Sequence, residues 1–83
     1  MTTTEGGFVH GRLRLTPREV TTLVLIAKGF SSYEMADLMN IKLSSFYCHR
    51  KSLFRKLDVR TDGEAVFEGF QLGIFKNILE ESK

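Results

Sequence analysis

Residues 42–60, KLSSFYCHRKSLFRKLDVR, combine the spacing of a helix with a concentration of positive charge. Phe46, Leu53 and Leu57 are separated by seven and four positions, which places them on one stripe of a helix. Six basic residues against one acid give this stretch a formal charge of +5, while six against nine give the rest of the chain −3. A helix with one apolar stripe and a basic exposed face suits the groove of a duplex nucleic acid.

The size and composition of the chain limit what it can be. Its 83 residues predict one small domain of marginal stability, which a partner subunit would help. One cysteine cannot form an internal disulfide, and no Cys/His cluster suggests a metal. No signal peptide or membrane span is recognisable. We therefore expect a cytoplasmic domain with no cofactor, no metal and no membrane partner.

Three capping boxes predict where helices begin, because a Ser or Thr side chain there caps a helix whose third residue is Glu. They are TPRE at 16–19, SSYE at 31–34 and TDGE at 61–64. Gly29 and Asn40 are expected to end the first two helices, since both tolerate a left-handed backbone. The fold class predicted is all-α, with four helices near 17–28, 32–39, 43–57 and 62–80. Residues 1–14 are expected to form a flexible N-terminal tail, and residues 15–83 the folded domain.

The last predicted helix carries apolar residues on more than one face. Val66, Phe70 and Ile74 lie on a different line from Phe67 and Phe75. A surface helix of a monomer needs one apolar stripe, so the second stripe favours a contact with a second copy of the same helix. Gly69 and Gly73 either allow two such helices to approach closely or merely weaken the helix.

Two short helices joined by a tight turn, the second of them basic, are typical of a helix-turn-helix. Residues 15–66 resemble the LuxR/FixJ/GerE-type DNA-binding domain of bacterial transcription regulators. The residues that carry the resemblance are LTPRE at 15–19, IAKGFS at 26–31, EMA at 34–36, then Ser45, His49, Leu53, Lys56, Leu57, Ala65 and Val66.

The resemblance implies that the third helix enters the major groove and that the fourth forms a dimer contact. Its base-contacting positions correspond here to Tyr47, Cys48 and Lys51, which helical spacing also places on one face. We expect phosphate contacts from Ser31, Ser32, Ser44, Ser45, Arg50, Arg55 and Lys56. The expected dimer interface consists of Phe67, Phe70, Gln71, Ile74, Phe75 and Ile78. Four features depart from the family pattern and bear on base preference: Thr22, Lys42-Leu43, Phe46 and Tyr47-Cys48.

Two residues of the third helix allow alternative readings. His49 is interpreted as a packed, hydrogen-bonded residue beside the turn rather than a pH switch or a phosphate donor. Cys48 is interpreted as a small contact residue rather than a sensor of oxidants, because a reducing cell keeps a thiol reduced.

The sequence thus predicts a bacterial DNA-binding transcription regulator that binds duplex DNA as a homodimer. The alternative is an interaction module that keeps the fold and pairs with another regulator or RNA polymerase without reading DNA specifically. A third possibility is a domain similar to a region of a sigma factor, but the match in the fourth helix favours the regulator family over this class. No constellation of catalytic side chains indicates an enzyme. The sequence does not give the operator or the direction of regulation. The domain either stands alone or belongs to a longer regulator with a receiver or ligand-binding domain.

Overall fold

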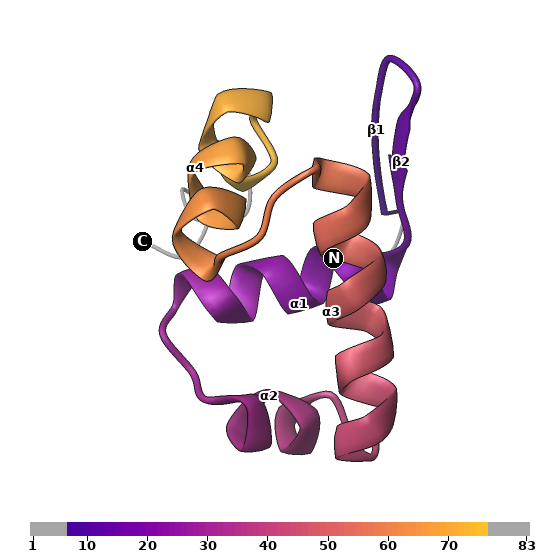
Figure 1. Ribbon diagram of the computed structural model, residues 1–83, viewed down its shortest axis with the longest axis vertical. Coiled ribbons are helices and arrows are strands. Elements are labelled where there is room, and N and C mark those ends of the chain that lie inside the picture. Colours follow the sequence, from indigo (N-terminus) through magenta and orange to yellow (C-terminus); the bar gives the residue numbers. More distant parts are fainter. Residues whose placement is uncertain (1–6, 77–83) are drawn as a thin grey trace.

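The computed structural model describes residues 7–76, which form four helices and a small antiparallel hairpin (Figure 1). The elements are β1 (Phe8–His10), β2 (Leu13–Leu15), α1 (Pro17–Ala27), α2 (Ser32–Leu38), α3 (Leu43–Leu57) and α4 (Asp62–Leu72). The predicted four-helix fold is confirmed, and the hairpin is an addition to it. No helix within residues 7–76 is long and apolar enough to cross a membrane.

The three predicted capping boxes are all present. In α1, α2 and α4 the N-cap side chain accepts a hydrogen bond from the backbone of a Glu three positions on, and that Glu caps the N-cap residue in return. In the α1 box, the Glu19 backbone N–H donates to Thr16 Oγ1 at 3.1 Å, and the Thr16 N–H donates to Glu19 Oε1 at 2.8 Å. α3 differs, because its N-cap residue Lys42 provides no side-chain hydrogen bond.

All four helices end in the same way, in a left-handed residue followed by an apolar one. The left-handed residues are Gly29, Asn40, Asp58 and Gly73, with φ of 88°, 57°, 58° and 82°. The apolar followers are Phe30, Ile41, Val59 and Ile74, and each donates its backbone N–H to a carbonyl five positions earlier. This Schellman arrangement satisfies carbonyls that a helix end leaves without partners. The predicted roles of Gly29 and Asn40 are confirmed.

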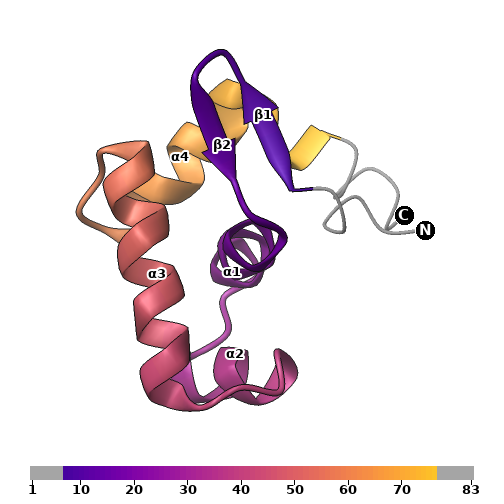
Figure 2. The same cartoon turned by 90° about the vertical axis from the view of Figure 1, so that its right-hand side faces the viewer.

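The core lies around α1, which packs against α2, α3, α4 and β2 and is seen nearly end-on in Figure 2. The predicted stripe of α3 faces it, since Phe46, Leu53 and Leu57 are buried. Thr22 is also buried, and its hydroxyl donates to the Arg18 carbonyl at 2.8 Å, which satisfies this polar group inside the core. α2 and α3 are joined by the short turn at Asn40, as a helix-turn-helix requires.

The segment over residues 7–15 is more ordered than the predicted tail. Phe8 pairs with Leu15, Val9 with Arg14 and His10 with Leu13 in an antiparallel register. Leu15 is buried in the main core, and Phe8 and Leu13 pack against that core. The apolar side chains of this short stretch therefore hold a hairpin against the helices, where its polar and glycine-rich composition predicts a tail.

The predicted extent of the fourth helix is wrong, because α4 ends at Leu72 rather than near residue 80. Gly73 adopts φ 82° and reverses the chain, so that Ile74 and Phe75 fold back into the core at 4% and 2% exposure. The Phe75 ring meets Phe70 edge-on, with ring centroids 4.9 Å apart. The sequence predicts Ile74 and Phe75 in a dimer interface, but both are buried within one chain, and a dimer contact by them does not fit this fold. Ile78 lies outside the described residues.

Gly69 leaves room for Phe75 to fold back against α4, so it does not provide a close contact between two copies. A Cβ at this position would overlap the Phe75 ring and lie 3.2 Å from Leu23 Cδ2. Gly73 in turn supplies the left-handed conformation that ends the helix. The close-approach reading of this glycine pair is wrong, because both glycines shape the monomer.

We expect Gly69→Ala to lower the free energy of unfolding by about 1 kcal/mol, measured by chemical denaturation. Alanine gains about 1 kcal/mol of helix propensity, but displacing a packed ring costs about 1–3 kcal/mol. Gly63→Ala is the matched control, because it lies in the same helix and nothing stands within 4 Å of its added methyl group. Stabilisation by both substitutions would contradict the packing of Phe75 against Gly69.

Candidate nucleic-acid interface

One face of α3 is exposed along the length of the helix. Ser44, Tyr47, Cys48, Lys51 and Arg55 are all exposed, and their spacing of three and four positions aligns them along the helix. The opposite stripe is buried, so the helix presents this face outward over its 15 residues. The three predicted base-contacting side chains are thus brought together with two of the predicted phosphate-contacting ones.

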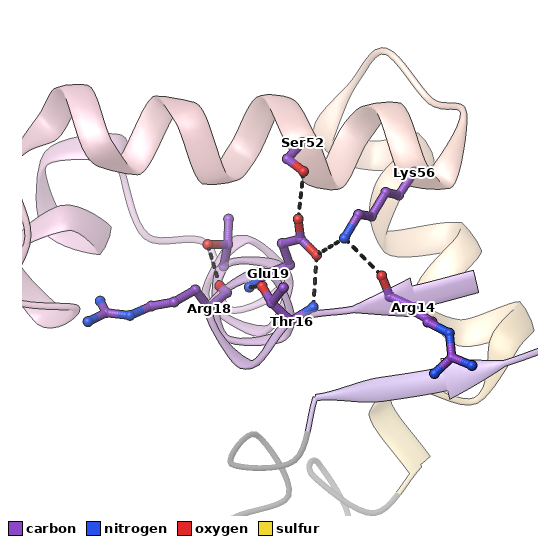
Figure 3. A network of polar contacts seen from close by, with 7 residues as sticks. Arg14, Thr16, Arg18, Glu19, Ser52 and Lys56 are labelled. Atoms are coloured by element: carbon purple, nitrogen blue, oxygen red, sulfur yellow. Dashed lines mark hydrogen bonds and ion pairs between the residues drawn. The ribbon is translucent and has the colours of Figure 1, made fainter. Parts of the chain in front are cut away.

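On the flank that faces α1, side chains of α3 form hydrogen bonds with a buried carboxylate. Glu19 is 3% exposed, and its Oε2 accepts a hydrogen bond from Ser52 Oγ at 2.6 Å (Figure 3). Lys56 Nζ donates to Glu19 Oε1 and to the Arg14 carbonyl, each at 2.9 Å. The same Oε1 accepts from the Thr16 N–H at 2.8 Å. One carboxylate therefore joins the start of α1 to α3, and Lys56 extends the connection to the hairpin.

This network gives Lys56 a different role from the predicted one. Its ammonium group already donates to two internal acceptors, so its prediction as a phosphate contact is not supported by the geometry. Sequence reasoning missed both Glu19 and Ser52 as members of one network. The available signal was the spacing of Ser52 and Lys56, which lie four apart on a flank next to the apolar stripe.

The network also sets the ionisation of Glu19. Burial by itself would raise the pKa of this carboxyl group, because it disfavours the charged form. Hydrogen bonds from Lys56, Ser52 and the Thr16 backbone, together with the positive charge of Lys56, outweigh burial and hold the pKa of Glu19 below its usual value. Glu19 is therefore a carboxylate at neutral pH.

The other flank of α3, which faces α4, carries a second pair. Arg50 Nη2 lies 2.7 Å from Asp62 Oδ1, and the Arg50 guanidinium stands 4.2 Å from the centre of the Phe54 ring. Asp62 is the first residue of α4, so this pair joins the basic helix to the next one. Of the three predicted arginine and lysine phosphate contacts, Arg55 alone has no internal ion pair among the described residues.

The serines predicted to contact phosphates differ in their surroundings. Ser44 is exposed, whereas Ser32 and Ser45 are half-buried. Ser31 is engaged as a cap: its hydroxyl accepts from the Glu34 N–H at 3.2 Å, and its own N–H donates to Glu34 Oε1 at 2.8 Å. A phosphate at this end of α2 would have to compete with the Glu34 carboxylate.

The remaining predicted contacts lie on α4. Phe67, Phe70 and Gln71 are exposed, at 60% and 61% for the two aromatic side chains. Within residues 7–76 no group of three His, Cys, Asp or Glu side chains is placed to hold a metal ion.

A short helix, a Schellman turn at Asn40 and a longer helix with a free basic face define a helix-turn-helix DNA-binding domain. Residues 13–68 match the family model of bacterial regulatory proteins, luxR family, and the chain belongs to that family. Domains of this type are typical of DNA-binding transcription regulators.

Response regulators of staphylococci are among the curated relatives of this chain. The chain is 39% identical over 57 residues to "Response regulator protein VraR" of Staphylococcus aureus, and equally to the proteins of that name from Staphylococcus saprophyticus and Staphylococcus epidermidis. The match covers 69% of this chain and 27% of each relative, so the chain spans about a quarter of their length. No solved structure matches the chain.

Proposed function

We propose that this domain regulates transcription by binding duplex DNA, with α3 lying in the major groove. The observation that carries the proposal is the single outward face of α3, where Lys51 and Arg55 have no internal ion pair among the described residues while Lys56 and Arg50 are paired with acids. Lys51 would donate to guanine O6 or N7, and Tyr47 would contact a base edge or a thymine methyl group, with Cys48 between them. Arg55 and Ser44 would hold the flanking phosphates, which position a protein without specifying sequence.

The start of α3 supports this orientation. Lys42 provides no side-chain cap, and the first turn contains no acidic residue. The backbone N–H groups of such a turn carry partial positive charge, which favours an approaching phosphate. The likeness to the VraR response regulators supports a role as the part of a regulator that binds DNA.

We further propose that two copies associate through α4. Phe67 and Phe70 form an exposed apolar pair beside Gln71, and aromatic side chains of this kind are enriched in interfaces. In such a dimer two α3 helices would enter successive major grooves, with half-site centres about 10 base pairs apart.

The experiment that tests the function is a selection of binding sites from random duplex DNA, read at two salt concentrations. An inverted repeat is expected, with affinity falling with salt at a log–log slope of about −0.9 for each phosphate neutralised. Recovery of no common sequence would overturn the proposed function.

We expect the double substitution Phe67→Asp and Phe70→Asp to weaken self-association at least about tenfold, since buried aromatic anchors are worth about 2 kcal/mol or more in an interface. The measurement is sedimentation equilibrium over a range of concentrations. Tyr33→Asp on α2 is the matched control, because Tyr33 is also an exposed aromatic residue, at 74%. A dimer that survives the double substitution unchanged would place the interface elsewhere.

The exposed Phe67 and Phe70 also favour a second candidate function. The same surface would serve an interaction module that pairs with another regulator or with RNA polymerase. DNA binding without sequence preference, together with capture of such a partner that Phe67→Asp abolishes, would favour this module over a DNA-reading regulator.

A further inference from the structure

Arg50 occupies an unusual place on the basic helix. It lies one turn from Tyr47 and one turn from Phe54, at the edge of the outward face and not in its centre. Its side chain is 33% exposed, and the Asp62 side chain that accepts its 2.7 Å hydrogen bond is 57% exposed. The charge of Arg50 is thus close to the proposed DNA surface but is turned toward α4.

The ion pair with Asp62 orients the Arg50 side chain, but it is weak enough for a competing anion to break it. The Phe54 ring lies 4.2 Å below the guanidinium and favours one placement of the side chain. An exposed ion pair contributes little net free energy, because water solvates both charges and salt screens them. A DNA phosphate would therefore compete with Asp62 on nearly equal terms for this guanidinium, because the N–H groups of an arginine donate to a carboxylate and to a phosphate alike.

We propose that Asp62 is a specificity-determining residue that withholds Arg50 from DNA until a phosphate is correctly placed beside it. The inference rests on the proposed function, and it adds a role for an acidic residue outside α3. On a poorly fitted sequence Arg50 stays with Asp62 and contributes no phosphate contact. On a well-fitted site the strand presents a phosphate at the edge of α3, and Arg50 exchanges one anion for the other.

The proposal predicts that removing the negative charge of Asp62 raises the affinity for random-sequence DNA more than the affinity for the selected site. Asp62→Asn keeps the shape of the side chain and removes its charge, so Arg50 is released toward any phosphate. Affinity for a random-sequence duplex is expected to rise about two- to fivefold, which is the most that an exposed ion pair can withhold. The log–log salt slope should steepen by about 0.9, as for one added phosphate contact. Affinity for the selected site should change less, so the ratio of specific to non-specific binding falls.

The experiment compares wild type, Asp62→Asn, Arg50→Ala and the double variant by fluorescence anisotropy with a random-sequence duplex and with the selected site. Salt is varied from 50 to 200 mM, and denaturation curves check that each variant is folded. Glu68→Gln is the matched control, because it removes the same charge from α4 and Glu68 forms no ion pair within residues 7–76. A merely structural role of Asp62 would change the denaturation midpoint and leave the salt slope unaltered.

The expected result is a steeper salt slope for Asp62→Asn that disappears when Arg50 is also replaced. An equal gain in the Arg50→Ala background, or an equal gain from Glu68→Gln, would overturn the inference, because the effect would then be one of net charge. The random duplex keeps the two proposals distinguishable. Absence of sequence preference in wild type would overturn the proposed function and the effect of Asp62 on specificity, while the slopes would still decide whether Asp62 withholds Arg50 from phosphates. If no variant binds any duplex at 50 mM salt, both are overturned.

Discussion

Glu19→Ala is expected to lower the free energy of unfolding by about 3 kcal/mol, the largest loss expected from a single polar residue of this domain. The substitution removes the acceptor for Ser52, Lys56 and the Thr16 backbone at once, in a position that is 3% exposed. Breaking a buried ion pair costs about 3–5 kcal/mol. We place the loss at the lower end because the Lys56 side chain is 33% exposed and regains water.

Glu34→Ala provides the control for this measurement. Glu34 holds the same position in the capping box of α2 that Glu19 holds in α1, but it is exposed and its carboxylate caps Ser31 without contacting another helix. Losing a cap alone costs about 1 kcal/mol. Chemical denaturation followed by circular dichroism should therefore separate the two variants by about 2 kcal/mol, and equal losses would contradict the network.

The pH dependence of stability follows from the same residue. The pKa of Glu19 is lower in the folded chain than in the unfolded chain, so the folded chain holds its proton less tightly. The contribution of Glu19 is then fully present above about pH 5 and is lost as pH falls through 4 and below. Glu19→Gln should flatten the dependence of the unfolding free energy on pH below about pH 5. An unchanged acid limb in this variant would show that other carboxyl groups cause it.

Lys51→Ala is expected to weaken binding to the selected site by about 1–3 kcal/mol and to relax the preference at one base pair. Lys51 stands between Tyr47 and Arg55 on the outward face, and it has no ion pair within residues 7–76, so its three donors are available to a base edge. The measurement is affinity for the selected site and for its single-base variants.

Arg55→Ala is the matched comparison, because Arg55 lies one turn further along the same face. It should weaken binding to all sequences alike and lower the salt slope by about 0.9, as the loss of a phosphate contact does. If Lys51→Ala leaves both affinity and base preference intact, then α3 does not read DNA through this face and the proposed docking is wrong.

Much of the fold could be predicted because its signals are local. Each capping box lies within four residues, and each helix ends in a left-handed residue followed by an apolar one. Asp58-Val59 and Gly73-Ile74 carry the same stop signal as Gly29-Phe30. Apolar spacing continues past Gly73 and so predicts a longer fourth helix. Spacing alone does not reveal that Ile74 and Phe75 return to the same core.

The candidate site, too, could be predicted only where its signals are local. The outward face of α3 follows from residue spacing within one helix, so Tyr47, Cys48 and Lys51 could be grouped from the sequence. Which cations remain available on that helix could not be predicted, because their partners are distant in the chain. Lys56 meets Glu19, 37 positions away, and Arg50 meets Asp62, 12 positions away on another helix. Local chemistry therefore settles where helices start, stop and face. Tertiary packing decides which charges on α3 are held in ion pairs, since an ion pair forms only where folding brings its partners together.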